Sequence, residues 1–188
     1  MLPPSREVSA PATDVPTAVG PVRDASRDTG RVPVVIRPYR SSDASATLQV
    51  FLDAVTRTAS ADYSPEQIEA WARREDRDPG DWDRARSARA TVVAVVGGEV
   101  AGFSDVDAEG WIDMLFVSPE HGRRGVAAAL LAHVESLARE ERAVALGTDA
   151  SLTAQPFFER HGFVVVERRH PVRRGVVLVN HRMRKPLG

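Results

Sequence analysis

The chain has 188 residues, of which 43% are hydrophobic and 27% charged, with a formal net charge of -1 and no cysteine. This length suits one globular domain with a tail, and the near-neutral charge argues against binding a polyanion such as DNA. The lack of cysteine excludes disulfides, thiolate zinc sites and a cysteine nucleophile. No apolar run is long enough for a membrane helix, and no signal peptide is evident at the amino terminus. We therefore expect a cytoplasmic protein that binds neither nucleic acid nor membrane.

Residues 1–32 are rich in proline and contain no aromatic residue. Such a composition cannot bury enough apolar surface to offset the entropy of ordering, so we expect a disordered tail here and a folded domain over residues 33–188. The tail is interpreted either as a partner-binding arm or as an extension without a role, and the second interpretation is favoured.

The first elements of the folded domain are expected to be a strand and two helices. A short apolar run at residues 34–39 contains Pro38, which suits an edge strand. Residues 41–43 can cap a helix, and residues 64–67 carry the Ser-Pro-x-Gln pattern of a capping box with proline at the first helical position. Residues 78–82 are expected to form a loop.

From about residue 90 the hydrophobic pattern acquires the period of strands. Residues 91–96, 100–106 and 111–117 are expected to form a three-stranded antiparallel meander, and a long amphipathic helix follows from Val126. A strand, a helix and two strands are expected at residues 143–146, 151–160, 163–166 and 176–179. The order of elements predicts a mixed α/β (α+β) fold with about seven strands, mostly antiparallel, and helices on both faces.

The junction between the third meander strand and the long helix has the features of an anion site. Gly122 and Gly125 let backbone N–H groups approach a ligand, and the amides of the first helical turn have no intrahelical acceptor. Arg123 and Arg124 add positive charge. The other phosphate-binding loops, the zinc motif H-E-x-x-H and the hydrolase motif G-x-S-x-G are missing from the sequence.

The same junction resembles motif A of the GNAT superfamily of N-acetyltransferases, with Val-Ser-Pro at 117–119 followed by G-R-R-G-V-A-A-A-L-L at 122–131. Residues 151–163, which end in Gly-Phe, resemble motif B of that family. Further similarities, which point to a bacterial branch of uncharacterised acetyltransferases, lie at residues 36–38, 62–67 and 100–103 and at Trp71. The resemblance covers the chain from about residue 33 to its end, and it implies a splayed central sheet.

By this resemblance the co-substrate is acetyl-CoA, and no metal is involved. The implied cofactor-binding residues are Leu115, Phe116 and Val117 for pantetheine, Gly122, Arg123, Arg124, Gly125, Val126 and Ala127 for the phosphates, and Ser151 and Phe158. Two positions depart from the family pattern. Gly122 replaces a Gln or Arg, and Phe158 replaces the Tyr that protonates the departing thiolate in many members, which phenylalanine cannot do.

Direct attack of an amine on the thioester in a ternary complex is the simplest mechanism, because no enzyme nucleophile is evident. Asp113, on the strand face of Trp111 and Leu115, is the leading general base, and the alternative is a structural carboxylate that pairs with arginine or caps a neighbouring loop. Glu109 is a weaker candidate. Ser151 can contact the cofactor, donate a proton or cap a helix, and Tyr63 can supply the missing hydroxyl or simply be half-buried.

Two further groups of side chains have two interpretations each. Trp71 and Trp82 can line an acceptor pocket or pack in the core. The C-terminal arginines can attract an acidic acceptor or protein tail, or can lie on a solvated strand edge that resists aggregation, which is the favoured interpretation. These arginines are Arg168, Arg169, Arg173, Arg174, Arg182 and Arg184.

Three functional hypotheses follow. The favoured one is an N-acetyltransferase acting on the amine of a small molecule or peptide, as a monomer or homodimer. The alternative is a non-catalytic acyl-CoA-binding or sensing module, motivated by Gly122 and Phe158. A toxin-like acetyltransferase acting on aminoacyl-tRNA comes third, because it demands a basic face that the near-neutral charge does not favour.

Overall fold

The computed structural model describes residues 32–188, so the expected tail lies outside the described residues except for Val32. The helices are α1 (Ala44–Asp53), α2 (Pro65–Ala72), α3 (Pro79–Ser87), α4 (Val126–Glu140) and α5 (Gln155–Arg160), and a π-helical turn (Ala54–Thr58) extends α1. Short 3-10 turns lie at Ser41–Asp43, Ala59–Ala61, Arg74–Asp76 and Pro119–His121. The strands are β1 (Val34–Pro38), β2 (Ala90–Val96), β3 (Glu99–Val106), β4 (Trp111–Ile112), β5 (Leu115–Val117), β6 (Ala145–Ser151), β7 (Val164–Arg169), β8 (Val172–Arg173), β9 (Val176–Val177) and β10 (Asn180–Pro186).

The strands form two four-stranded sheets, with the orders β1-β2-β3-β5 and β4-β6-β10-β7, and a separate β8-β9 ribbon. Every pairing is antiparallel except that of β4 with β6. The expected mixed fold, mostly antiparallel, is confirmed, as is the position of β1 at a sheet edge. The expected meander is confirmed for β2, β3 and β5, which holds only the second part of its third expected strand.

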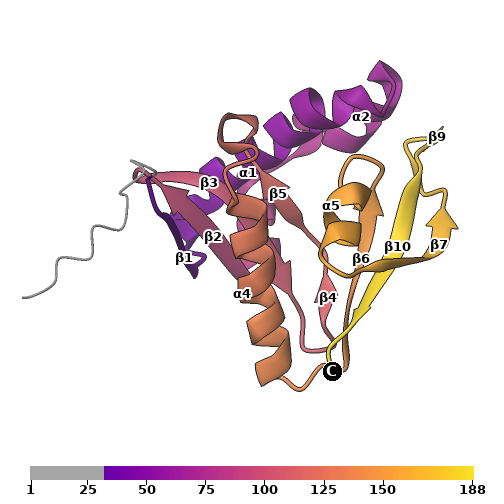
Figure 1. The fold of residues 1–188 in the computed structure, drawn as a ribbon. Coiled ribbons are helices and arrows are strands. Elements are labelled where there is room, and N and C mark those ends of the chain that lie inside the picture. The colour runs from indigo at the N-terminus through magenta and orange to yellow at the C-terminus, as the bar shows by residue number, and fades with distance from the viewer. Residues whose placement is uncertain (1–31) are drawn as a thin grey trace, which may run out of the picture. The chain divides into compact units, whose positions relative to one another are not determined.

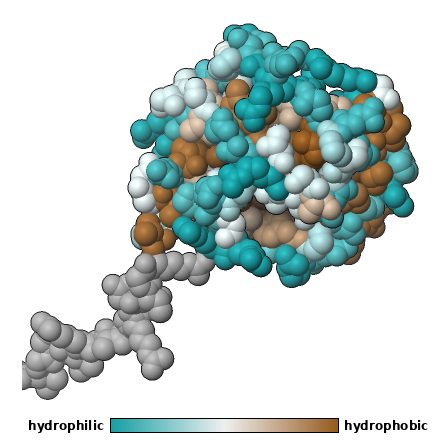
Figure 2. Space-filling view, turned by 90° about the horizontal axis from the view of Figure 1, so that it is seen from above, coloured by the Kyte–Doolittle hydropathy of each residue, from teal (hydrophilic) through white to brown (hydrophobic). Residues whose placement is uncertain are grey.

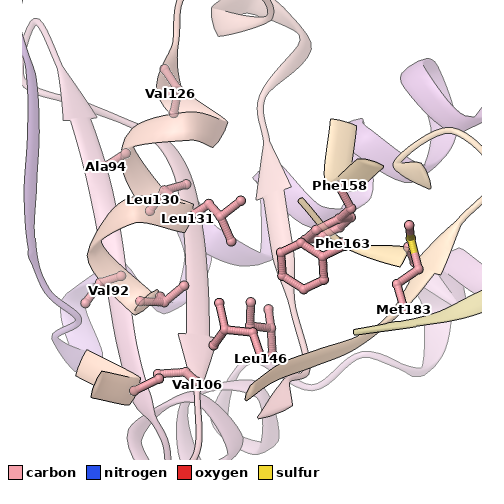
Figure 3. Packing of buried hydrophobic residues seen from close by; sticks show 14 of the residues in the cluster. Val92, Ala94, Val106, Val126, Leu130, Leu131, Leu146, Phe158, Phe163 and Met183 are labelled. Atoms are coloured by element: carbon pink, nitrogen blue, oxygen red, sulfur yellow. The ribbon is translucent and has the colours of Figure 1, made fainter. Parts of the chain in front are cut away.

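Helices cover both faces of the first sheet, as expected (Figure 1). Alternate side chains of a strand point to opposite faces, and in β2 Val92 packs in the cluster that contains α4, whereas Val93 packs in the cluster that contains α1. Leu130 and Leu131 of α4 face the strands, and the first cluster continues to Phe158, Phe163 and Met183 beside the second sheet (Figure 3). One helix thus packs against elements of both sheets.

Local capping explains where α2 and α3 begin. Ser64 accepts the N–H of Gln67, whose side chain accepts the N–H of Ser64, so the expected capping box is confirmed. The loop expected at residues 78–82 was wrong, because Asp78 accepts the N–H of Asp81 at 2.9 Å and starts α3, with Pro79 at the first helical position. An Asp-Pro pair suits a turn and a helix start equally, and here it starts a helix.

The single strand expected at residues 111–117 is divided in the structure. Its first part, β4, pairs with β6, and its second part, β5, pairs with β3, so the chain passes from one sheet to the other at Asp113 and Met114. The carboxylate of Asp105, on β3, accepts the N–H groups of Asp113 at 3.0 Å and Met114 at 3.4 Å. A buried side chain thus adds to the backbone hydrogen bond from Asp105 N–H to the carbonyl of Met114 at the point where the sheets separate.

The C-terminal strands also differ from expectation. The strand expected at residues 143–146 is the longer β6, and the helix expected from residue 151 begins only at Gln155. Residues 176–177 belong to the small ribbon, whereas the last long strand is the polar β10, which lies between β6 and β7. Hydropathy did not reveal β10 because most of its side chains are polar. Over residues 32–188, each helix is too short or too polar to cross a lipid bilayer.

Candidate functional site

The site begins where β5 and β6 separate. The strand β4 pairs with β6 at Trp111 opposite Gly147 and Ile112 opposite Thr148, and the pairing ends there. Beyond this point β5 pairs only with β3 on its other side, and β6 pairs only with β10. Figure 1 shows the two strands diverging from β4. The facing edges of β5 and β6 therefore offer backbone N–H and C=O groups to an extended ligand.

The N-terminus of α4 follows β5 after a short turn. Arg123 has φ 56° and Gly125, the N-cap, has φ 84°, so two residues before the helix have a left-handed backbone conformation. Successive amides in such a turn point to the same side and form an anion-binding concavity, which the helix dipole reinforces. Gly122, Arg123, Arg124 and Gly125 are exposed, and Val126 is buried against the core. These geometric features fit a phosphate group.

A cavity of about 540 Å³ lies on the other side of β5 and β6. Aromatic side chains contribute to its wall, among them Trp71, Trp111 and Phe116. Trp82, by contrast, is 5% exposed and donates its indole N–H to Thr47, so the two tryptophans paired in the sequence hypothesis have different roles. Seen from above, the molecule has a hollow with a hydrophobic interior and mostly hydrophilic surroundings (Figure 2).

Asp113 lies at the point where the two sheets separate and lines the cavity. Its side chain is 48% exposed, and one carboxylate oxygen lies 3.4 Å from the Nη2 atom of Arg86. Arg86 is buried and forms its main ion pair with Asp105. The expected alternative, an aspartate paired with arginine, therefore holds in part, while the exposed carboxylate remains accessible from the cavity.

Tyr63 and Ser151 line the same cavity. The Tyr63 hydroxyl donates to the carbonyl of Val179 at 2.5 Å and accepts the N–H of Leu152 at 3.0 Å, and burial raises the pKa of this hydroxyl. Ser151 ends β6 instead of beginning a helix, and its Oγ accepts the N–H of Ala154 at 3.1 Å. That hydrogen bond closes the turn before α5. Because the Ser151 oxygen is the acceptor in it, the hydroxyl proton of Ser151 can be donated to another group.

Phe158 is 3% exposed and packs in the apolar cluster shared with α4. Figure 3 shows it with Phe163 and Leu146. Its ring contacts Phe157 and Phe163 edge-on, at centroid distances of 5.3 and 5.0 Å. The side chain contributes packing at this position, and it has no atom that can transfer a proton.

The favoured interpretation of the C-terminal arginines as a solvated strand edge was wrong for Arg182 and Arg184, because they belong to β10, which is a central strand. Arg169 and Arg182 both form ion pairs with Asp149, at 2.7 and 3.0 Å, because β10 lies between β6 and β7. Arg169 and Arg173 line the cavity, and Arg174 pairs with Asp76. Arg168 is exposed on the edge strand β7, as the edge interpretation expects, whereas Arg184 is exposed but lies on the central strand β10.

Five charged side chains near the site were missed by the sequence reasoning, namely Arg73, Arg77, Arg86, Asp105 and Asp149. Asp105 lies in a buried part of β3 and Asp149 is the one charged residue of β6, which was a usable signal, because an ionisable group in a buried strand needs a partner. Arg77 had no such signal. It lies in the connection between α2 and α3, and only the tertiary structure brings it to the cavity.

Comparison with known proteins agrees with this architecture. Residues 59–185 match the family described as "Acetyltransferase (GNAT) domain". The chain is 42% identical to the uncharacterized N-acetyltransferase YafP of Escherichia coli (strain K12), over 80% of this chain and 95% of that protein.

Two solved structures have the same fold. A GCN5-related N-acetyltransferase from Rhodopseudomonas palustris has a TM-score of 0.79 and 34% identity, over 84% of this chain and 98% of that one. YncA, a putative acetyltransferase from Salmonella typhimurium solved with its cofactor acetyl-CoA, has a TM-score of 0.62 and 18% identity, over 83% of this chain and 95% of that one.

Proposed function

This chain belongs to the GNAT family of acetyltransferases, and we propose that it transfers the acetyl group of acetyl-CoA to a primary amine of a small molecule or peptide by direct attack in a ternary complex. The observation that carries the proposal is the separation of β5 from β6, with the amide-rich start of α4 at one side and a cavity containing Asp113 at the other. Such an arrangement brings a thioester and an amine together at one point.

In the proposed complex the pantetheine arm pairs with the backbone of Leu115, Phe116 and Val117. The pyrophosphate binds the amides from Gly122 to Ala127, and the exposed Arg123 adds charge to that site. The unpaired edge of β5 and the two left-handed residues before α4 support this assignment. Binding through backbone groups explains how the site tolerates glycine at position 122, where the family pattern has a long polar side chain.

Asp113 is proposed as the general base, because an amine that is protonated at neutral pH must lose a proton before it attacks. Its carboxylate is accessible from the cavity, directly or through water. The amine nitrogen then forms a bond to the thioester carbon, and the C–S bond breaks when the tetrahedral intermediate collapses. Ser151 is proposed to protonate the departing thiolate, and Tyr63, whose proton is donated to Val179, is proposed to hold the cavity wall.

Release of free CoA thiol from acetyl-CoA in the presence of a broad amine panel tests the proposal. We expect the Asp113→Asn variant to lower kcat/KM at pH 7 by about 10²–10⁴-fold, the usual contribution of general base catalysis, and to bind acetyl-CoA as the wild type does. Glu109→Gln is the matched control, because Glu109 is an exposed carboxylate in the turn before β4 and does not line the cavity.

Two results would contradict the proposal at different levels. Unchanged turnover in Asp113→Asn would remove Asp113 as the base and leave acetyl transfer intact. Binding of acetyl-CoA by calorimetry, without thiol release for any amine in the panel, would instead support the acyl-CoA-binding module.

A further inference from the structure

The wall of the cavity is positively charged although the whole chain is not. Four arginines line it, namely Arg73, Arg77, Arg169 and Arg173, against the two aspartates Asp113 and Asp149. The lining therefore has a formal excess of two positive charges in a chain whose net charge is -1. Asp149 is further neutralised by Arg182, which is not a lining residue. Positive charge concentrated at one cavity favours an anionic ligand there.

Arg77 is the most unusual of these arginines. It is half-buried, and within residues 32–188 no carboxylate pairs with it. Its Nε and Nη2 atoms donate to the carbonyls of Ala72 at 2.9 Å and Trp71 at 3.3 Å, and its guanidinium lies 4.3 Å from the ring centroid of Phe51. These contacts fix the plane of the guanidinium and leave Nη1 without a partner in the described part of the chain.

The surroundings of Arg77 repel its charge. Burial lowers the pKa of the Arg77 guanidinium, and the charges of Arg73, Arg86 and Arg173 lower it further. A half-buried cation among other cations, without a counterion, is unfavourable, so an anion from solution gains both an ion pair and relief of this repulsion. Arg173, on the β8-β9 ribbon, also lacks an ion pair within the described residues and lines the same cavity.

We propose that the acceptor amine carries an anionic group, a carboxylate or a phosphoryl group, which binds Arg77 and Arg173. The proposal rests on the proposed function, since it identifies the class of acceptor for the same site. The proposal distinguishes this anion site from the site proposed for the CoA phosphates. The residues proposed for the CoA phosphates, from Gly122 to Ala127, do not line this cavity, so the two proposed anion sites consist of different residues.

Matched amines test the proposal. The thiol-release assay is run with β-alanine, its neutral amide β-alaninamide, and 2-aminoethylphosphonate, and with phenylalanine, its amide and its phosphonate analogue. We expect kcat/KM to be at least about tenfold higher for the anionic members than for the amides, because a charge-assisted hydrogen bond to a fixed guanidinium is strong. The carboxylate and phosphonate arms show which anion is preferred.

Variants connect this preference to particular residues. Arg77→Met is expected to raise KM for the preferred anionic amine about 10- to 100-fold, with less than about a twofold change for its amide. Arg173→Ala, on an exposed ribbon where folding is little affected, is expected to raise the same KM about three- to fivefold. Arg168→Ala is the matched control, because Arg168 is exposed on β7 and does not line the cavity.

Calorimetry with the same six amines, in the presence of CoA, separates the two levels of failure. Preferential binding of the anionic amines without thiol release would overturn the proposed function and support the anion site. If the amides are acetylated or bound as well as the anionic amines, or better, the anion site would be overturned even if acetyl transfer is established. An anionic preference that survives in both Arg77→Met and Arg173→Ala would overturn the assignment to these arginines.

Discussion

Asp105 is the side chain whose loss is expected to disturb both the stability and the site. It is 0% exposed, it forms an ion pair with the 4% exposed Arg86, and it lies 3.1 Å from Nε of Arg89. It also accepts the N–H groups of Asp113 and Met114 where β4 and β5 separate. Because the Asp105 carboxylate contacts two arginines and two backbone N–H groups, we expect the backbone geometry between β4 and β5 to depend on it.

We expect Asp105→Ala to lower the free energy of unfolding by about 3 kcal/mol. Removing one partner of a buried ion pair costs about 3–5 kcal/mol, because the other charge remains buried without compensation. The lower end applies here, because Asp113 remains 3.4 Å from Arg86. Against a total stability of about 5–15 kcal/mol, the loss is easily measured by urea unfolding followed by tryptophan fluorescence.

Two variants serve as controls for this prediction. Asp76→Ala removes a surface carboxylate that pairs with Arg73 and Arg174, and it is expected to cost at most about 1 kcal/mol. Asp105→Leu combined with Arg86→Met removes both buried charges and is expected to recover much of the loss. If Asp105→Ala costs no more than Asp76→Ala, the reasoning about the buried carboxylate is refuted.

Two further predictions concern folding. Arg37 donates to Asp43 at 2.7 Å, and this hydrogen bond lowers the pKa of the Asp43 carboxyl. The carboxylate therefore stabilises the fold fully above its unfolded pKa of about 3.9, and this contribution is lost as the pH falls through the lower pKa of the folded state. Asp43→Asn should therefore cost about 1–3 kcal/mol at pH 7 in urea unfolding, and a difference from wild type that stayed constant down to about pH 2 would contradict this. Gly102→Ala should lower the free energy of unfolding by about 1–3 kcal/mol, because the new Cβ would lie 2.8 Å from the carbonyl of Phe116, and unchanged urea and thermal midpoints would rule out this clash.

The sequence predicted most of the fold because its signals were local. The 3.6-residue period of α4, the capping box at Ser64 and the alternation of β2 each depend on residues close together in the chain. The prediction was wrong where a local signal was ambiguous or absent. Asp78-Pro79 suits a turn as well as a helix start, and the polar β10 has no hydrophobic period.

For the site, the sequence by itself determined the loop before α4, because its glycines, arginines and helix start are contiguous in the chain. It also singled out Asp113, as an ionisable residue in an apolar strand. Only the tertiary structure decided what surrounds that carboxylate. Arg77 and Asp149 come from distant segments, and no local pattern records that they line one cavity or that Asp149 is neutralised by two arginines.

The physical reason is that backbone geometry depends on neighbours in the chain, whereas the charge of a cavity depends on neighbours in space. Hydrophobic periodicity and capping select helices and strands one element at a time. At the separation of β5 from β6, the side chain of Asp105 accepts the N–H groups of Asp113 and Met114 from another segment. The charge of the cavity is set by which arginines the fold leaves without a carboxylate. The loop proposed to bind the CoA phosphates could therefore be recognised in the sequence, whereas the cavity proposed for the acceptor became visible only in the folded chain.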